Sequence, residues 1–325
     1  MSAAGTDINK AAPLFIGCII SWFLSGSLMV QTYDYFCDDH LEGDMIGIKL
    51  AVGLAFILDM ARSMSVTSAG WERLVSGWGD PTSFSRISIF AAMTVPLTGL
   101  ESCVVQTFFA WRIWNLRRGS KVGRFVPCII SSVRGLHGFL FFVLRVCVQV
   151  ALVQFAAAVV HGICCYQSDN FNIGKEWLKL STEIWLSGSF LCDCIIVMTM
   201  IILLVQAKLE SSFVLTRRLI DRLIIVTLET GAITVVVILV QLGIYIKYPE
   251  DALQHVAVMY ILGGLYANVL LAVLNGRKRA RRLVALTHHS LSLHFAEHIP
   301  SRFSSATLQE ALMSDTIMRS SQVSV

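Results

Sequence analysis

The stretch that decides the fold is residues 88–124, which read SIFAAMTVPLTGLESCVVQTFFAWRIWNLRRGSKVGR. Its first part, residues 88–111, holds Glu101 as its single charged side chain and is long enough for a helix to cross the ~30 Å of hydrocarbon in a bilayer. Basic side chains crowd the second part, at Arg112, Arg117, Arg118, Lys121 and Arg124. A long apolar segment followed at once by a basic edge is typical of a membrane-spanning helix that ends at the cytoplasmic surface.

The rest of the chain repeats this pattern. Of the 325 residues, 55% are hydrophobic and 15% are charged, whereas a soluble domain carries about 25% charged residues. The apolar residues gather in seven runs, at 13–33, 49–69, 88–111, 147–167, 184–206, 223–246 and 255–274. Only helices and closed barrels satisfy every backbone polar group in lipid, and these runs are too long and too uniformly apolar for barrel strands. We therefore predict an all-α, polytopic membrane protein in which a seven-transmembrane-helix bundle occupies residues 13–276.

The distribution of basic residues predicts the orientation of the bundle. Short loops rich in Lys and Arg face the cytoplasm, and the connections after the third, fifth and seventh runs are the basic ones. The first run lacks the cleavage site of a signal peptide, so we expect it to remain as a permanent helix. We therefore predict that the short N-terminus, residues 1–12, lies outside and the C-terminal segment in the cytoplasm, as in a multi-pass protein of the plasma membrane.

Residues 277–325 differ in composition from the bundle. They begin with RKRARR and continue with many Ser, Thr and His residues. In a soluble protein this basic run would suggest a nuclear signal, but directly after a membrane helix it indicates contact with anionic lipid headgroups. The tail histidines form no closed ligand set, and the polar composition predicts disorder. We therefore expect the lipid bilayer and anionic lipids as partners, and no nucleic acid, metal or other cofactor.

Charged side chains near the middle of the predicted spans are the candidate functional residues. A charge at the bilayer centre costs about 2.5–3.5 kcal/mol on insertion scales, so each one calls for an explanation. Asp59 and Arg62 are three residues apart, on one face of the second span, and can neutralise each other. Glu101 lies in the third span and Asp193 in the fifth.

These four residues have two interpretations. They form either a pocket for the amine, cation or proton of a small-molecule ligand, or a structural lattice of ion pairs between the second, third and fifth helices. The structural interpretation is favoured by the sequence; in the other, Asp59, Arg62, Glu101 and Asp193 are the ligand-binding residues.

For two asparagines in the seventh span, we expect structural roles. Asn268 and Asn275 lie one heptad apart. We predict an interhelical hydrogen bond at Asn268 and a helix C-cap at Asn275, directly before Gly276.

Residues 125–168, between the basic edge and the next loop, are too many for one span and awkward for two. Within them, residues 133–145, VRGLHGFLFFVLR, mix basic and apolar side chains. This segment is interpreted either as an amphipathic, cationic helix on the inner leaflet or as the translation of a retained intron. The second interpretation is favoured, because the segment has neither the character of a span nor that of the loops around it.

Three motifs resemble a large family of fungal seven-helix membrane proteins that is defined by a domain of unknown function. They are VQTFFAWRIWNL at 105–116, LIDRLIIVTLETG at 219–231 and GGLYANVLLAVLNGRK at 263–278. The resemblance extends over about residues 10–280. It implies seven spans and a membrane location, and it brings no substrate, ligand or catalytic residue.

Three classes of function fit this pattern. A receptor-like protein that senses a small ligand fits the seven spans, the external N-terminus and the basic inner loops, and is our first choice. A transporter that handles protons or cations could use the carboxyl groups, although no internal repeat is evident. A non-catalytic structural protein is the third. A retinal pigment is excluded because residues 255–274 contain no lysine, and His161 alone does not make a metal hydrolase, so we expect no enzyme.

Overall fold

The computed structural model describes residues 3–37, 45–84, 86–119, 130–167, 172–210, 214–247 and 252–297. Its long elements are all α-helices: α1 (Ala3–Phe36), α2 (Ile46–Trp71), α3 (Ile89–Gly119), α4 (Ile130–Gln167), α5 (Asn172–Glu210), α6 (Val214–Lys247) and α7 (Ala252–Glu297). Two short elements follow α2, the π-helix η2 (Glu72–Ser76) and the 3₁₀-helix η3 (Pro81–Phe84). The described residues include no strand, which confirms the all-α prediction.

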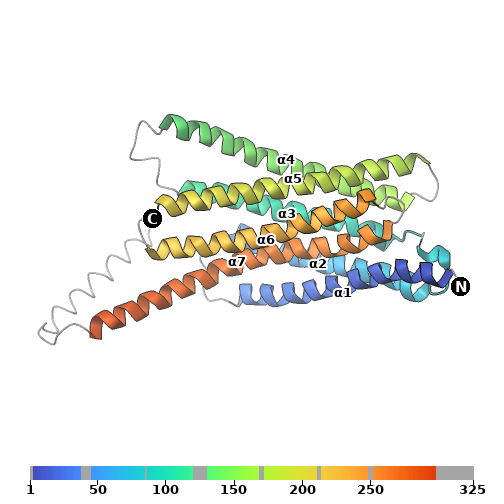
Figure 1. Cartoon of the computed structure of the whole chain (residues 1–325), viewed down its shortest axis with the longest axis horizontal. Coiled ribbons are helices and arrows are strands. Elements are labelled where there is room, and N and C mark those ends of the chain that lie inside the picture. The colour runs from blue at the N-terminus through green and yellow to red at the C-terminus, as the bar shows by residue number, and fades with distance from the viewer. Residues whose placement is uncertain are drawn as a thin grey trace, which may run out of the picture. The chain divides into compact units, whose positions relative to one another are not determined.

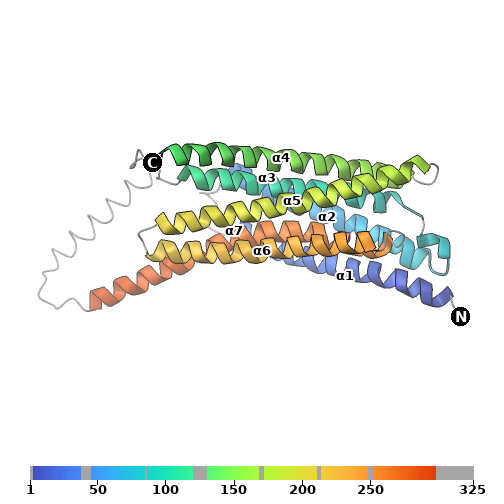
Figure 2. The same ribbon diagram turned by 45° about the horizontal axis from the view of Figure 1, so that its top comes forward.

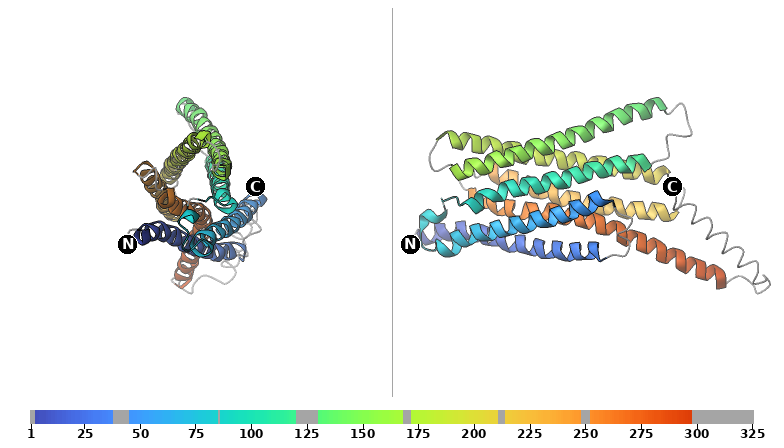
Figure 3. Two further views of the ribbon diagram at one scale, coloured as in Figure 1. Left: turned by 90° about the vertical axis from the view of Figure 1, so that its right-hand side faces the viewer. Right: turned by 180° about the vertical axis from the view of Figure 1, so that it is seen from behind.

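The chain divides into two units, residues 1–278 and residues 279–325. In the first unit, the helices lie side by side with roughly parallel axes (Figures 1 and 2). Figure 3 (left) shows the same helices seen along these axes, gathered in one bundle. Most of the polar side chains discussed below are buried.

Helix α7 lies at the centre of this bundle, whereas α1, α4 and α6 lie at its periphery. In the most apolar part of α7, 72% of the residues are buried, against 22% in α6 and 28% in both α1 and α4. Many large apolar side chains of the peripheral helices are exposed, for example Phe23 and Val236. A helix that exposes such residues along its length suits contact with lipid.

Six segments are long and apolar enough to cross a membrane: Ala11–Phe36, Thr82–Asn115, Phe142–Gln167, Glu176–Leu209, Ile220–Lys247 and Gln254–Arg277. They correspond to six of the seven predicted spans and indicate a multi-pass membrane protein. The remaining predicted span, residues 49–69, lies within α2, which is not among the six. Seven crossings and their orientation therefore remain predictions.

Helix α7 does not end where the sequence suggested. It continues through Gly276 to Glu297, so the predicted C-cap at Asn275 is wrong and the first part of the expected disordered tail is helical. Ala, Leu, Arg and Lys, which are strong helix formers, follow Gly276 and no Pro occurs before residue 300. Residues 298–325 lie outside the described residues, as do Lys121 and Arg124 of the basic loop.

Helix α4 also begins earlier than the predicted span. It starts at Ile130 and is continuous to Gln167, so the backbone of residues 133–145 belongs to the same helix as the span. A separate helix on the inner leaflet, divided from the span by a turn, is therefore not seen.

Candidate functional site

Buried charges from α2 and α3 meet on one guanidinium group. The side chains of Asp59 and Arg62 on α2 and of Glu101 on α3 have no exposed surface. Arg62 forms an ion pair with Asp59 through Nη2, and its Nε lies 3.3 Å from Oε2 of Glu101. The spacing of three residues places the first pair on one face of α2, and the packing of α3 against α2 adds Glu101.

Hydrogen bonds from α1 and α7 complete this site. Nη1 of Arg62 donates to Oγ of Ser21 at 3.1 Å and to the backbone oxygen of Tyr260 at 2.6 Å. Oγ of Ser25 donates to Oδ2 of Asp59 at 2.7 Å. The site thus joins four helices through one side chain. We call the group of Ser21, Ser25, Asp59, Arg62 and Glu101 the Arg62 cluster.

The charges of the Arg62 cluster do not balance. It contains two carboxyl groups and one guanidinium group. The contact between Nε of Arg62 and Glu101 is within ion-pair distance, but it lacks hydrogen-bond geometry, and both Glu101 oxygens accept no hydrogen bond among the described residues. A buried polar atom without a partner is unfavourable by about 1–3 kcal/mol. Glu101 is therefore the member with capacity for an additional proton, cation or donor.

Two glycines of α7 allow its backbone to approach this cluster. A Cβ atom on Gly263 would lie 2.5 Å from Cδ of Arg62 and 2.7 Å from Oε2 of Glu101. On Gly264 it would lie 2.9 Å from Nη2 of Arg62. Only a residue without a side chain fits at this distance, and the approach is what brings the Tyr260 carbonyl to the guanidinium group.

Asp193 belongs to a second buried site. Nε2 of Gln106 donates to Oδ1 of Asp193, and the Tyr266 hydroxyl donates to Oδ2, both at 2.9 Å. Nε2 of Gln154 donates to Oε1 of Gln106, and the Ser189 hydroxyl donates to Oε1 of Gln154 at 2.9 Å. These five residues, on α3, α4, α5 and α7, are all buried. No hydrogen bond or ion pair between described residues links them to the Arg62 cluster.

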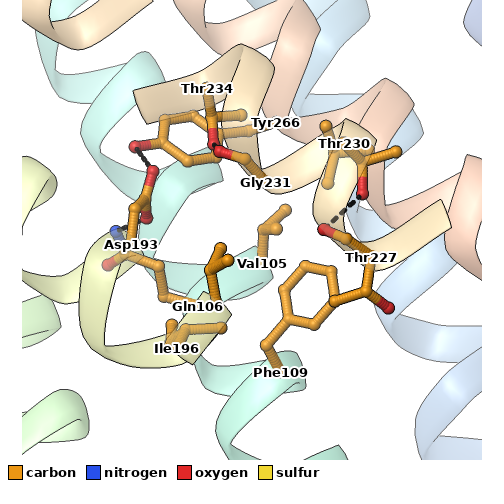
Figure 4. Close-up of a pocket in the computed structure, with 12 residues that line it drawn as sticks. Val105, Gln106, Phe109, Asp193, Ile196, Thr227, Thr230, Gly231, Thr234 and Tyr266 are labelled. Atoms are coloured by element: carbon orange, nitrogen blue, oxygen red, sulfur yellow. Dashed lines mark hydrogen bonds between the residues drawn. The ribbon is translucent and has the colours of Figure 1, made fainter. Parts of the chain in front are cut away.

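A small cavity adjoins Asp193. Figure 4 shows Gln106 and Tyr266 directed toward the Asp193 carboxyl group, with Val105 and Phe109 on another wall. Threonines of α6 also line the cavity, and Oγ1 of Thr227 has no hydrogen-bond partner among the described residues. Its volume of ≈ 30 Å³ is enough for one or two water molecules. It is too small for an organic ligand in this arrangement of the helices.

The asparagines of α7 connect that helix to α1. Nδ2 of Asn268 donates to the Leu24 carbonyl at 2.9 Å, and its Oδ1 accepts from Gln31 at 2.8 Å. This confirms the interhelical bond predicted at Asn268. Asn275 plays the same role in place of the expected cap, because its Nδ2 donates to the Gln31 carbonyl at 2.9 Å.

Three of the four candidate residues therefore lie together and one lies apart. Asp59, Arg62 and Glu101 share a cluster, whereas Asp193 is held by neutral partners. The sequence reasoning did not identify Gln154, Ser189 and Tyr266 as part of a site. An uncharged polar side chain in the middle of an apolar run, such as Gln154, is the signal that would have suggested it.

Residues 189–279 match a family of unknown function (DUF6534). The match includes Asp193 and Tyr266 but neither Arg62 nor Glu101. No curated protein and no solved structure matches the chain. For this part of the chain, the predicted resemblance to a family defined by a domain of unknown function is confirmed, while the fungal origin and the seven spans that the resemblance implies stay expectations.

Proposed function

We propose that the chain is a receptor-like membrane protein whose helices α1–α7 all cross the bilayer, with the N-terminus outside and the C-terminus in the cytoplasm. The proposed ligand is a small molecule with a cationic group, such as an amine. It acts on the Arg62 cluster, which holds the bundle in its resting arrangement.

The observation that carries this proposal is the excess carboxyl group at Glu101. Its two oxygens are buried and lack hydrogen-bond donors among the described residues, next to a guanidinium group that Asp59 already neutralises. An ammonium group would supply both the charge and the donors that Glu101 lacks. Because α3 meets Arg62 through Glu101, a cation that replaces Arg62 there would release α3 from α2.

Binding of this kind requires two arrangements of the helices. The Arg62 cluster has no exposed side chain, so a ligand reaches it only when the helices separate. A ligand shifts such an equilibrium by its difference in affinity for the two states. In a receptor, the ligand would shift the balance between these two arrangements. The hydrogen bonds of the Arg62 cluster, which join four helices, are the contacts that would break and form in that change.

Thermal unfolding of the purified protein in lipid nanodiscs tests the proposal. The probes are a panel of primary amines, with the matching N-acetyl amides as uncharged controls. An amine is expected to shift the unfolding temperature while its amide does not, and the shift should disappear in Glu101→Gln. Ser187→Ala, at an exposed position on α5, should keep the shift. If no amine shifts unfolding while Glu101→Gln unfolds at a lower temperature than the wild type, the cluster has only the structural role.

A transporter of protons or cations is the second candidate. The observation in its favour is Asp193, a buried carboxyl group for which no described residue provides a cation. Proton or sodium flux into liposomes that contain the protein would favour this candidate. Flux that persists in Asp193→Asn would show that Asp193 is not required for it and would contradict the transport role given to this residue.

A further inference from the structure

The hydrogen bonds around Asp193 run almost completely around a ring. From Ser189 they pass through Gln154 and Gln106 to Asp193, which also accepts from Tyr266. The Tyr266 hydroxyl in turn lies beside Ser189. We call these five residues, Gln106, Gln154, Ser189, Asp193 and Tyr266, the Asp193 ring.

With Asp193 ionised, the ring is incomplete. The carboxylate accepts hydrogen bonds from Gln106 and Tyr266 and has the Thr234 hydroxyl beside it, while Ser189 and Tyr266 both use their protons elsewhere. Neither hydroxyl group then has a proton left to donate to the other, so no hydrogen bond can join Ser189 to Tyr266. The negative charge is also uncompensated, and such a charge is expensive in a membrane interior.

With Asp193 protonated, every group of the ring can donate once and accept once. The acid donates to Oε1 of Gln106, whose amide donates to Gln154, and the Gln154 amide donates to Ser189. Ser189 then donates to Tyr266, which donates to the other Asp193 oxygen as before. This reversal needs rotation of two amide groups and one hydroxyl group, together with a new hydrogen bond between the neighbouring Ser189 and Tyr266 hydroxyl groups.

We propose that Asp193 is a proton-binding site and that the bound proton closes this ring of hydrogen bonds. The proton comes from water, and the only bond that forms is the O–H bond of the acid. The proposal does not rest on the receptor function, because it concerns a different cluster and requires no ligand.

The surroundings of Asp193 provide no positive charge that would replace the proton. Helix α6 presents the Thr234 hydroxyl, and its nearest acid, Glu229, is exposed. The titratable groups that face Asp193 or its neighbour Cys192 are Cys103 on α3, Cys147 on α4, Cys192 and Cys194 on α5, and Tyr266 on α7. None of these described groups is a cation.

The geometry favours a proton over a metal ion. Both Asp193 oxygens already accept hydrogen bonds. The adjoining cavity, of ≈ 30 Å³, has Val105, Phe109 and Ile196 among its walls. Asp193 is the one carboxyl group that lines the cavity, and the described residues contain no group of three His, Cys, Asp or Glu side chains that could hold a metal ion.

Infrared difference spectroscopy of the full chain in nanodiscs, between acid and alkaline solution, tests the proposal. A carbonyl stretching band of a protonated carboxyl group is expected in the wild type, and it should be lost in Asp193→Asn and kept in Glu101→Gln. Carbon-13 labelling of the aspartate carboxyl groups should shift the same band in the wild type, so the test holds even if a variant does not fold. A band that responds only to labelled glutamate, or no band at all, would overturn the proposal.

Stability gives an independent readout. An asparagine at residue 193 donates to Gln106 and accepts from Tyr266, as the protonated acid does, so Asp193→Asn should unfold within a few degrees of the wild type. Tyr266→Phe opens the ring and should unfold at a lower temperature. If Asp193→Asn loses as much stability as Asp193→Ala, the carboxylate is the form that the fold requires and the proposal fails. Stabilisation by sodium ions that is lost in Asp193→Asn would also overturn it, in favour of a metal ion.

Discussion

Nε of Arg62 lies 3.3 Å from Oε2 of Glu101, and both side chains are completely buried. Among the described residues, Arg62 is the one cation paired with Asp59 and Glu101, and its loss leaves both carboxyl groups without that partner. Breaking a buried ion pair on one side costs about 3–5 kcal/mol. We expect Arg62→Gln to unfold at a much lower temperature than the wild type and to give less folded protein, measured by thermal unfolding and by size-exclusion chromatography in detergent.

Removing the charges on both sides should restore much of this loss. In Asp59→Asn with Arg62→Gln, only Glu101 remains as an unpaired acid, and adding Glu101→Gln leaves no charge in the cluster. The partly exposed ion pair between Lys208 and Asp221, at 2.6 Å, is the control, and its removal should change stability by less than about 1 kcal/mol. Normal folding of Arg62→Gln alone would contradict the role given to the guanidinium group.

Gly263 should not tolerate a side chain. The methyl group of Gly263→Ala would lie 2.5 Å from Cδ of Arg62. Such overpacking typically lowers the free energy of unfolding by about 1–3 kcal/mol. Gly243→Ala on α6 is the matched control, because no atom lies within 4 Å of the added group. In a helix interior that change stabilises by about 0.5–1 kcal/mol. The unfolding temperature should fall in Gly263→Ala and rise in Gly243→Ala. A higher unfolding temperature in Gly263→Ala would show that α7 does not pack closely against the Arg62 cluster.

The sequence predicted the parts of this structure that depend on local spacing. Six apolar segments follow from their length, and the pairing of Asp59 with Arg62 follows from three residues on one helical face. The position of Glu101 against Arg62 and the separation of Asp193 from them depend on how the helices pack, which spacing along the chain does not determine. The end of α7 does not follow from Gly276, because a glycine often ends a helix whereas the residues after this one favour a helix.

The loop charges predict that residues 277–325 lie in the cytoplasm. A peptide tag after Val325 should resist protease added to intact cells and become sensitive after permeabilisation, because short basic connections remain on the cytoplasmic side. A tag before Met1 should be cleaved without permeabilisation. Cleavage of the C-terminal tag in intact cells would reverse the orientation and place the basic connections outside.

Helix α4 is much longer than a single membrane span, which allows a test of whether residues 133–145 belong to the native protein. Its 38 residues extend over about 57 Å, nearly twice the ~30 Å of hydrocarbon that one span has to cross. Joining residues 129–132 directly to Val146 would leave a helix of ordinary length. We expect most mature transcripts to lack the codons for residues 133–145, as a retained intron predicts. The protein without these residues should then fold with the same unfolding temperature as the full chain. Transcripts that mostly keep these codons, together with poor folding of the shortened protein, would establish the long helix as native.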